Sequence, residues 1–146
     1  MFNKILVVCV GNICRSPSGE ALLKRLLPGK KIRSAGLNTD KSGLKGKPAD
    51  RMATEIAAEN GVSLEGHQAQ QLTAELCREF DLILVMEKVH IDAVVSVAPE
   101  ARGKTMLFGQ WIGQHDIPDP FRMSREAYEY AYHLIDKAAL AWVEKL

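Results

Sequence analysis

The sequence has no long apolar run, few cysteines and almost no excess of charge. No stretch approaches the roughly 20 apolar residues of a membrane-spanning helix, and residues 1–4 lead directly into a strand-like segment without the apolar region of a signal peptide. Three cysteines are an odd number and too few for a disulfide framework. We therefore expect a cytoplasmic protein that is not membrane-embedded, with cysteines that are either catalytic or buried.

The formal net charge is only +1 over 146 residues. This balance gives no general attraction to nucleic acid or to a membrane surface, so an anion-binding site must be local. The length suits one domain with a single hydrophobic core, and we assign residues 1–146 to it.

Short apolar runs alternate with segments of helical pattern along the whole chain. The alternation predicts an α/β domain with a parallel sheet and helices on both faces. The expected strands are residues 5–8, 31–35, 82–86 and 105–108, and the expected helices are 17–27, 49–59, 73–78, 88–97 and 124–144. Ser16, Thr73 and Ser124 are the expected N-cap residues.

The strongest signal is the loop between the first strand and the first helix, which reads Cys9-Val10-Gly11-Asn12-Ile13-Cys14-Arg15-Ser16. A strand-to-helix turn directs backbone N–H groups and the helix dipole at one point, where a phosphate dianion binds. Gly11 and Asn12 both tolerate positive φ. Arg15 adds a planar fork that can hold two phosphate oxygens. We therefore expect this phosphate loop to bind a phosphoryl group.

Cys9 begins this loop and is the expected nucleophile. A helix N-terminus and a nearby arginine favour a thiolate over a thiol, and a thiolate behind the bound phosphorus can attack in line to form a cysteinyl-phosphate. We expect no metal or other cofactor, because backbone amides and Arg15 can neutralise the phosphoryl oxygens. A nucleotide P-loop would need a second glycine and a lysine, and a thioredoxin-like site would need C-x-x-C, so neither alternative fits.

Departure of an alcohol from a phosphate ester also needs a proton donor. Asp119 stands between Pro118 and Pro120, which restrict the backbone on both sides. Loops that follow parallel strands emerge at the same edge of a sheet, so this loop can reach Cys9. We expect Asp119 to be the general acid and then the general base. Asp116 lacks the flanking prolines and is the weaker candidate.

Five segments, taken in order, resemble the low-molecular-weight protein tyrosine phosphatases over the whole chain. They are Cys9–Pro17, Ser34–Gly36, Leu64–His67, Asp81–Met86 and Asp119–Phe121. The resemblance implies a four-stranded parallel sheet and hydrolysis of phosphotyrosine in proteins. It makes Cys9 the nucleophile, Arg15 the phosphate clamp and Asp119 the acid.

The same resemblance implies supporting roles for three further side chains. Ser16 would donate a hydrogen bond to the thiolate, and Ser34 and His67 would hold Asn12 in its loop conformation. The substrate pocket would have an apolar wall formed by Ile13, Leu44 and Phe121.

Two features of this sequence resemble the bacterial branch of the family, which partners tyrosine autokinases in exopolysaccharide export. The 38–47 loop carries Leu44 and no aromatic residue, and Phe121 is followed by Arg122 instead of a second aromatic residue. The expected partner is therefore a phosphotyrosine protein, namely a bacterial tyrosine autokinase.

Two other functions are possible on the same loop. An arsenate reductase would resemble this family but would need two further redox cysteines near the third strand, where only Cys77 is available. A phosphate-binding module without activity would not need Cys9, Arg15 and Asp119 together. The role of Cys14 stays open, since it either fills space under the loop or traps an oxidised Cys9 as a disulfide.

Overall fold

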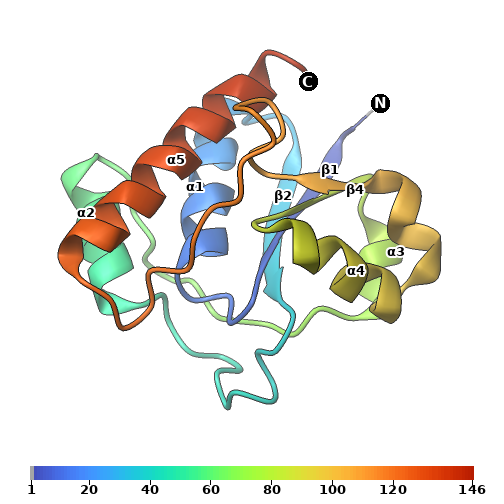
Figure 1. Ribbon diagram of the computed structural model, residues 1–146, viewed down its shortest axis with the longest axis horizontal. Coiled ribbons are helices and arrows are strands. Elements are labelled where there is room, and N and C mark those ends of the chain that lie inside the picture. The colour runs from blue at the N-terminus through green and yellow to red at the C-terminus, as the bar shows by residue number, and fades with distance from the viewer. Residues whose placement is uncertain (1) are drawn as a thin grey trace.

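Four parallel strands form the centre of the molecule (Figure 1). The computed structural model describes residues 2–146. The strands are β1 (Lys4–Cys9), β2 (Lys31–Gly36), β3 (Leu82–Val85) and β4 (Thr105–Leu107), in the spatial order β2-β1-β3-β4. The helices are α1 (Arg15–Leu26), α2 (Arg51–Glu59), α3 (Ala74–Glu79), α4 (Lys88–Val97), η1 (Pro99–Lys104, a 3-10 helix) and α5 (Arg125–Val143). The predicted α/β fold with a four-stranded parallel sheet is confirmed.

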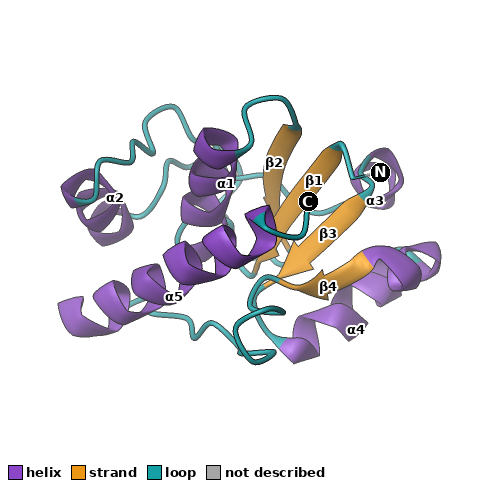
Figure 2. Ribbon diagram, turned by 90° about the horizontal axis from the view of Figure 1, so that it is seen from above, coloured by secondary structure: helices purple, strands orange, loops and turns teal. Residues whose placement is uncertain are grey.

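Helices cover both faces of the sheet, with α1, α2 and α5 on one face and α3 and α4 on the other (Figure 2). Alternate residues of β1 pack on opposite faces of the sheet, because successive side chains of a strand point to opposite faces. Ile5 and Val7 belong to the core under α1 and α5, whereas Leu6 and Val8 belong to the core under α3 and α4. Burial on both faces explains why β1 is apolar without a polar alternation.

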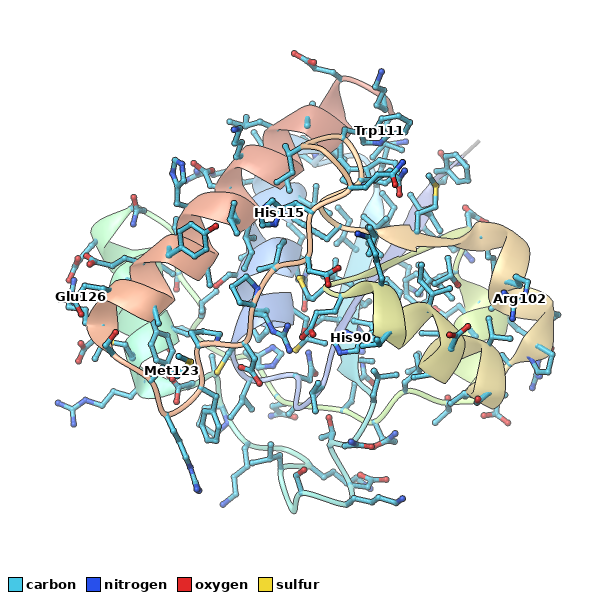
Figure 3. The ribbon with its side chains drawn as sticks, viewed as in Figure 1. His90, Arg102, Trp111, His115, Met123 and Glu126 are labelled. Atoms are coloured by element: carbon cyan, nitrogen blue, oxygen red, sulfur yellow. The ribbon has the colours of Figure 1, made fainter. Side chains whose placement is uncertain are left out.

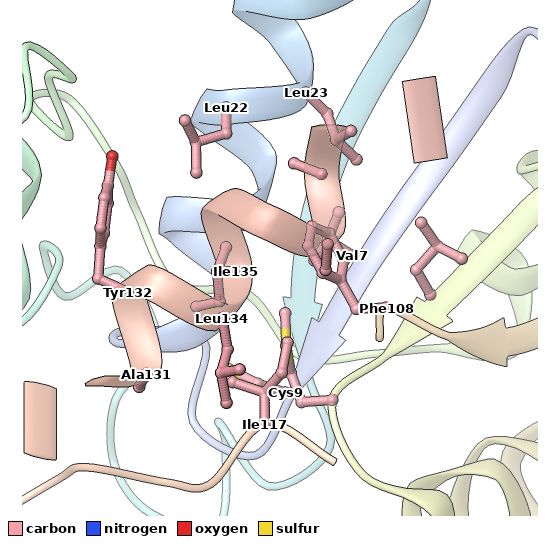
Figure 4. Packing of buried hydrophobic residues seen from close by; sticks show 14 of the residues in the cluster. Val7, Cys9, Leu22, Leu23, Phe108, Ile117, Ala131, Tyr132, Leu134 and Ile135 are labelled. Carbon is pink, nitrogen blue, oxygen red and sulfur yellow. The ribbon is translucent and has the colours of Figure 1, made fainter. Parts of the chain in front are cut away.

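The larger core reaches the carboxyl end of the sheet, where the candidate site lies. Val7, Leu22, Phe108 and Ile135 belong to one buried cluster, and Cys9 continues it at the end of β1 (Figure 4). The start of α1, and with it the phosphate loop, is therefore held by the packed interior of the protein.

Two helix starts differ from the sequence-based expectation. Helix α1 begins at Arg15 without a side-chain cap, because the hydroxyl of Ser16 bonds within the phosphate loop instead. Helix α2 begins at Arg51 and not at residue 49, since the carboxylate of Asp50 caps it by accepting from the N–H groups of its first turn. The caps expected at Thr73 and Ser124 are confirmed.

Among residues 2–146, none of the helices combines the length and the apolar character that crossing a membrane requires.

Candidate active site

Cys9 ends β1 and faces the phosphate loop. It is only 2% exposed, and its Sγ lies 2.9 Å from the hydroxyl oxygen of Ser16. That oxygen also accepts a hydrogen bond of 2.7 Å from the side-chain amide of Asn12. Since Ser16 Oγ accepts from Asn12, its own proton is free to point at the sulfur. Ser16 can therefore donate a hydrogen bond to Cys9, which is the contact that a thiolate requires.

Asn12 sets the direction of these hydrogen bonds. The backbone N–H of Gln70 donates to Asn12 Oδ1 at 3.0 Å, so the amide oxygen faces Gln70 and the NH₂ group faces the two serines. Asn12 Nδ2 donates to Ser16 and, at 2.9 Å, to Ser34. The hydroxyl of Ser34 in turn donates a hydrogen bond to the Glu20 carboxylate. One buried network thus orders four side chains behind the nucleophile.

The backbone of Asn12 lies in the left-handed region, with φ of 63°. Asparagine tolerates this conformation better than most residues. His67 Nε2 donates to the Asn12 carbonyl oxygen at 2.6 Å and holds the turn from the outside. The resemblance assigned the support of Asn12 to Ser34 and His67, and the structure places both in contact with it.

Two glycines allow the loop to close, and one of them does so differently from expectation. Gly11 does not have positive φ; a Cβ there would instead come within 2.9 Å of Leu44. Gly36, at the end of β2, packs directly on the loop, because a Cβ would lie 2.1 Å from Thr39 Oγ1 and 2.8 Å from the carbonyl of Val10. A larger residue at position 36 would have to displace the phosphate loop.

Arg15 is 2% exposed, and hydrogen bonds at one end of its guanidinium hold it in place. Its Nη1 donates to Glu87 Oε2 at 2.6 Å and to the carbonyl of Ile117 at 2.7 Å, and its Nη2 lies 3.8 Å from Asp119 Oδ2. Its Nε is buried and has no hydrogen-bond partner among the described residues. A buried guanidinium N–H without a partner is costly, and an oxyanion bound beside Cys9 would satisfy it.

Asp119 lies on the exposed side of the same site. Its side chain is 46% exposed, and its Oδ1 accepts from the N–H of Phe121 at 3.1 Å. Asp116 serves another purpose, since its Oδ1 accepts at 2.9 Å from the N–H of Lys88 at the start of α4. The structure therefore brings Asp119 toward Arg15 and places Asp116 at a helix end.

A cavity of about 310 Å³ opens between the phosphate loop and the Asp119 loop. Its walls include Cys9, Val10, Gly11, Ile13, Cys14, Arg15, Ser42, Leu44, Asp119, Phe121 and Arg122. Ile13, Leu44 and Phe121, the three residues expected to form an apolar wall, all line this cavity. Among the residues expected to bind phosphate, Asn12 and Ser16 do not line this cavity, and their side chains belong to the hydrogen-bond network behind it.

A second cavity of about 360 Å³ lies behind the loop, between α1, β2 and residues 63–70. Ser34 and His67 line it, but neither Cys9 nor Asp119 does. We place the active site in the smaller cavity because that is where a nucleophile, a cation and a carboxylate meet.

Cys14 is buried within the phosphate loop. Burial first, and then the nearby carboxylate of Asp50, raise the pKa of this thiol well above its ordinary value. Cys14 therefore stays protonated at neutral pH and does not compete with Cys9 as a nucleophile.

Sequence reasoning missed the residues that hold Arg15 from behind. Glu87 follows β3 by two residues, at the carboxyl edge of the sheet, and that position was the available signal. His90 lies one turn further along, on α4 (Figure 3), and its Nε2 is 3.6 Å from Glu87 Oε2. It is 6% exposed, and burial lowers its pKa although Glu87 opposes that shift. Thr39 and Gln70, which bond to the phosphate loop, carried no local signal.

In the part of the chain that the structure describes, no group of three or more histidine, cysteine or acidic side chains is arranged to hold a metal ion.

Comparison with known proteins gives consistent matches over the whole chain. The family profile "Low molecular weight phosphotyrosine protein phosphatase" matches residues 4–146. The chain is 57% identical over 146 residues to "Probable low molecular weight protein-tyrosine-phosphatase AmsI" of Erwinia amylovora, covering 100% of this chain and 99% of that protein. It is 55% identical over 145 residues to "Low molecular weight protein-tyrosine-phosphatase Etp" of Escherichia coli K12, covering 99% and 95%.

Among solved structures, Vibrio vulnificus Wzb in complex with benzylphosphonate matches with a TM-score of 0.98 and 66% identity, covering 100% of both chains. The profile match, the identities and the shared fold agree with the geometry around Cys9. The chain therefore belongs to the low molecular weight protein-tyrosine-phosphatase family.

Proposed function

We propose that this phosphatase hydrolyses phosphotyrosine in proteins through a cysteinyl-phosphate intermediate on Cys9. The Cys9 thiolate attacks phosphorus, so that a P–S bond forms as the P–O bond to tyrosine breaks. Asp119 gives its proton to the departing phenolate oxygen. The Asp119 carboxylate then takes a proton from water, whose oxygen attacks phosphorus and releases phosphate and the Cys9 thiolate.

The observation that carries this proposal is the unpartnered Nε of Arg15. This buried N–H belongs to a guanidinium already anchored by Glu87 and Ile117, so the remaining donors can face a phosphoryl group beside Cys9. Such preorganised donors stabilise the charge of the transition state without reorganising during the reaction.

The remaining residues of the cavity would bind the rest of the substrate. The backbone N–H groups of the phosphate loop at the start of α1 would bind phosphoryl oxygens. Ile13, Leu44 and Phe121 would contact the tyrosine ring. The bound benzylphosphonate in the Vibrio vulnificus relative, which joins an aromatic ring to a phosphonate, supports this division of the cavity.

We further propose that the substrate is a bacterial tyrosine autokinase of exopolysaccharide export. The support is the resemblance of the 38–47 loop and of Arg122 to the bacterial branch, together with the high identity to bacterial relatives. A cytoplasmic location accompanies this proposal, since Cys9, Cys14 and Cys77 are all free thiols.

Arsenate reduction is not the function that the geometry favours. A reductase that resembles this family would need two further redox cysteines near the third strand, where only Cys77 is available. Cys77 lies on α3 in the core on the opposite face of the sheet from Cys9, so it cannot form the first disulfide of such a relay without unfolding.

The test is a panel of phosphotyrosine peptides with matched phosphoserine peptides, assayed with the wild-type protein and with Cys9→Ser. We expect hydrolysis of the phosphotyrosine peptides alone, and none by Cys9→Ser. Equal hydrolysis of both peptide types, or turnover by Cys9→Ser, would overturn the proposal. Loss of phosphate from a phosphorylated autokinase domain tests the choice of partner.

A further inference from the structure

Arg122 occupies an unusual position at the mouth of the active-site cavity. Its φ is 62°, a conformation that a side chain as large as arginine rarely adopts. The turn is stabilised on both sides, because Phe121 N–H donates to Asp119 Oδ1 and Met123 N–H donates to the Pro120 carbonyl at 2.9 Å. The same turn therefore sets the place of the acid Asp119 and the place of Arg122.

The guanidinium of Arg122 lies 5.2 Å from the centre of the Phe121 ring, in the cation-π arrangement. Within residues 2–146, no carboxylate lies within 4 Å of this guanidinium. Asp119, its close neighbour in sequence, faces Arg15 instead. Arg122 thus carries a charge at the cavity mouth that nothing in the described chain neutralises.

The loop across the cavity adds charge of the same sign. Lys41, Lys45 and Lys47 are exposed and flank Ser42 and Leu44, which line the cavity. None of the three lysines forms an ion pair in the described part of the chain. The whole protein has a formal net charge of only +1, so this cationic rim is a local feature.

We propose that the cationic rim, defined as Arg122 with Lys41, Lys45 and Lys47, selects substrate segments that carry an anionic group next to the phosphotyrosine. This inference rests on the proposed phosphotyrosine activity and adds a substrate class to it. With the phosphotyrosine in the cavity, neighbouring substrate residues must pass over the mouth, where Arg122 can bind a carboxylate or a second phosphate through its planar fork. The lysines act at longer range by raising the rate of encounter with an acidic segment.

The test uses four peptides that share one phosphotyrosine and differ only in its neighbours: aspartate, a second phosphotyrosine, asparagine or lysine. For the wild-type protein we expect kcat/KM to be roughly three- to tenfold higher with either anionic neighbour than with asparagine, and lowest with lysine. This preference should shrink at high salt, because exposed charges are screened. A preference for the second phosphate alone would identify a phosphate as the bound anion and support the proposal.

Variants distinguish an effect of the cationic rim from an effect of positive charge elsewhere on the surface. Arg122→Gln should abolish most of the preference, and Lys41→Gln with Lys45→Gln should reduce its salt dependence. Arg102→Gln is the matched control, since Arg102 lies on η1, across the molecule from Met123, the neighbour of Arg122 (Figure 3). The control should keep the full preference.

Two results would overturn the proposal: equal kcat/KM for anionic and neutral neighbours in the wild-type protein, or an unchanged preference in Arg122→Gln. Failure of the underlying function would look different, because then none of the four peptides would be hydrolysed.

Discussion

The two loops that meet at the active site are built in opposite ways. In the phosphate loop, Cys9, Asn12 and Arg15 are at most 2% exposed. Cys9 contacts Ser16 of the same loop, and Asn12 and Arg15 donate hydrogen bonds to Ser34 and Glu87 on distant parts of the chain. In the Asp119 loop, by contrast, the side chain of Asp119, the proposed general acid, is 46% exposed and Phe121 is 39% exposed. The proposed anion site is therefore fixed before substrate arrives, whereas the position of the proposed acid depends on a short proline-flanked turn at the surface.

This contrast assigns different tasks to the two sides. Buried donors that are held in place lose little free energy to reorganisation when charge develops on the phosphoryl group. An exposed acid must only deliver a proton when the leaving group needs one. Changes on the buried side should therefore affect every substrate, and changes on the exposed side should depend on the leaving group.

Asp119→Ala is expected to have the largest substrate-dependent effect. The tyrosine leaving group has a pKa of about 10 and needs a proton, whereas nitrophenolate needs less help. We expect kcat to fall by about 10²–10⁴-fold with phosphotyrosine and by less with nitrophenyl phosphate, at nearly unchanged phosphate affinity.

Asp116→Ala is the matched control for this prediction. It removes the contact to the N–H of Lys88 at the start of α4 and should mainly lower stability, by about 1 kcal/mol as for other helix caps. If Asp116→Ala lowered kcat more than Asp119→Ala, our assignment of Asp119 as the general acid would be wrong.

Arg15→Lys tests the buried side directly. Lysine keeps the charge but loses the fork that bonds to Glu87, to Ile117 and, in our account, to phosphate. We expect kcat to fall by roughly 10²–10³-fold with both substrates alike, together with weaker inhibition by phosphate. An unequal loss on the two substrates would contradict the division between the loops.

Gly36→Ala should disturb the buried side from a distance. Its Cβ would lie 2.1 Å from Thr39 Oγ1 and 3.0 Å from Asn12 N, so the loop must move. We expect a loss of about 1–3 kcal/mol of stability and a roughly tenfold loss of kcat. Gly29→Ala is the control, because a Cβ there meets nothing within 4 Å. Thermal melts measure the stability of both variants, and a nitrophenyl phosphate assay measures their kcat. Equal values for Gly36→Ala and Gly29→Ala would contradict the prediction.

The smallest effect is expected from His90→Gln, and it depends on pH. Burial lowers the pKa of His90 below its usual 6.5 in the folded protein, and the charges of Glu87, Arg15, Asp116 and Asp119 act on it as well. The folded state therefore binds fewer protons than the unfolded state as pH falls below 6.5, so stability is lost toward acid pH. In His90→Gln, the part of the acid-pH loss of stability that comes from protonation of His90 should disappear.

The check is the melting temperature as a function of pH for wild-type, His90→Gln and His133→Gln. The third protein is the control, because His133 is exposed. An equally steep acid decline in wild-type and His90→Gln would show that His90 does not titrate as the structure indicates.

The comparison between the loops also explains what the sequence could predict. Cys9, Arg15 and Asp119, which the structure places around one cavity, could be proposed from the sequence because each stands in a local pattern, a strand-to-helix turn or a pair of prolines. Glu87 and Gln70 were not found as site residues, because they reach Arg15 and Asn12 across 72 and 58 positions of the chain. For Glu87 the only signal is its position after β3, and Gln70, which contacts Asn12 through its backbone N–H, leaves no short-range pattern.

Ser16 shows the same limit in another form. Its sequence position before Pro17 is typical of an N-cap, and by local rules that reading is sound. Its hydroxyl instead bonds to Cys9 and Asn12, because the tertiary structure places both side chains within hydrogen-bond distance of it. Local propensity failed here at the functional site.

The central claim is that Cys9 carries the phosphoryl group during turnover. The most direct measurement is mass spectrometry of the protein after rapid acid quenching during hydrolysis of a phosphotyrosine peptide, with Cys14→Ser as a second sample. We predict a phosphoryl group on the peptide containing Cys9, present in wild-type and in Cys14→Ser and absent from Cys9→Ser. A phosphoryl group on another residue, or full turnover by Cys9→Ser, would contradict the account.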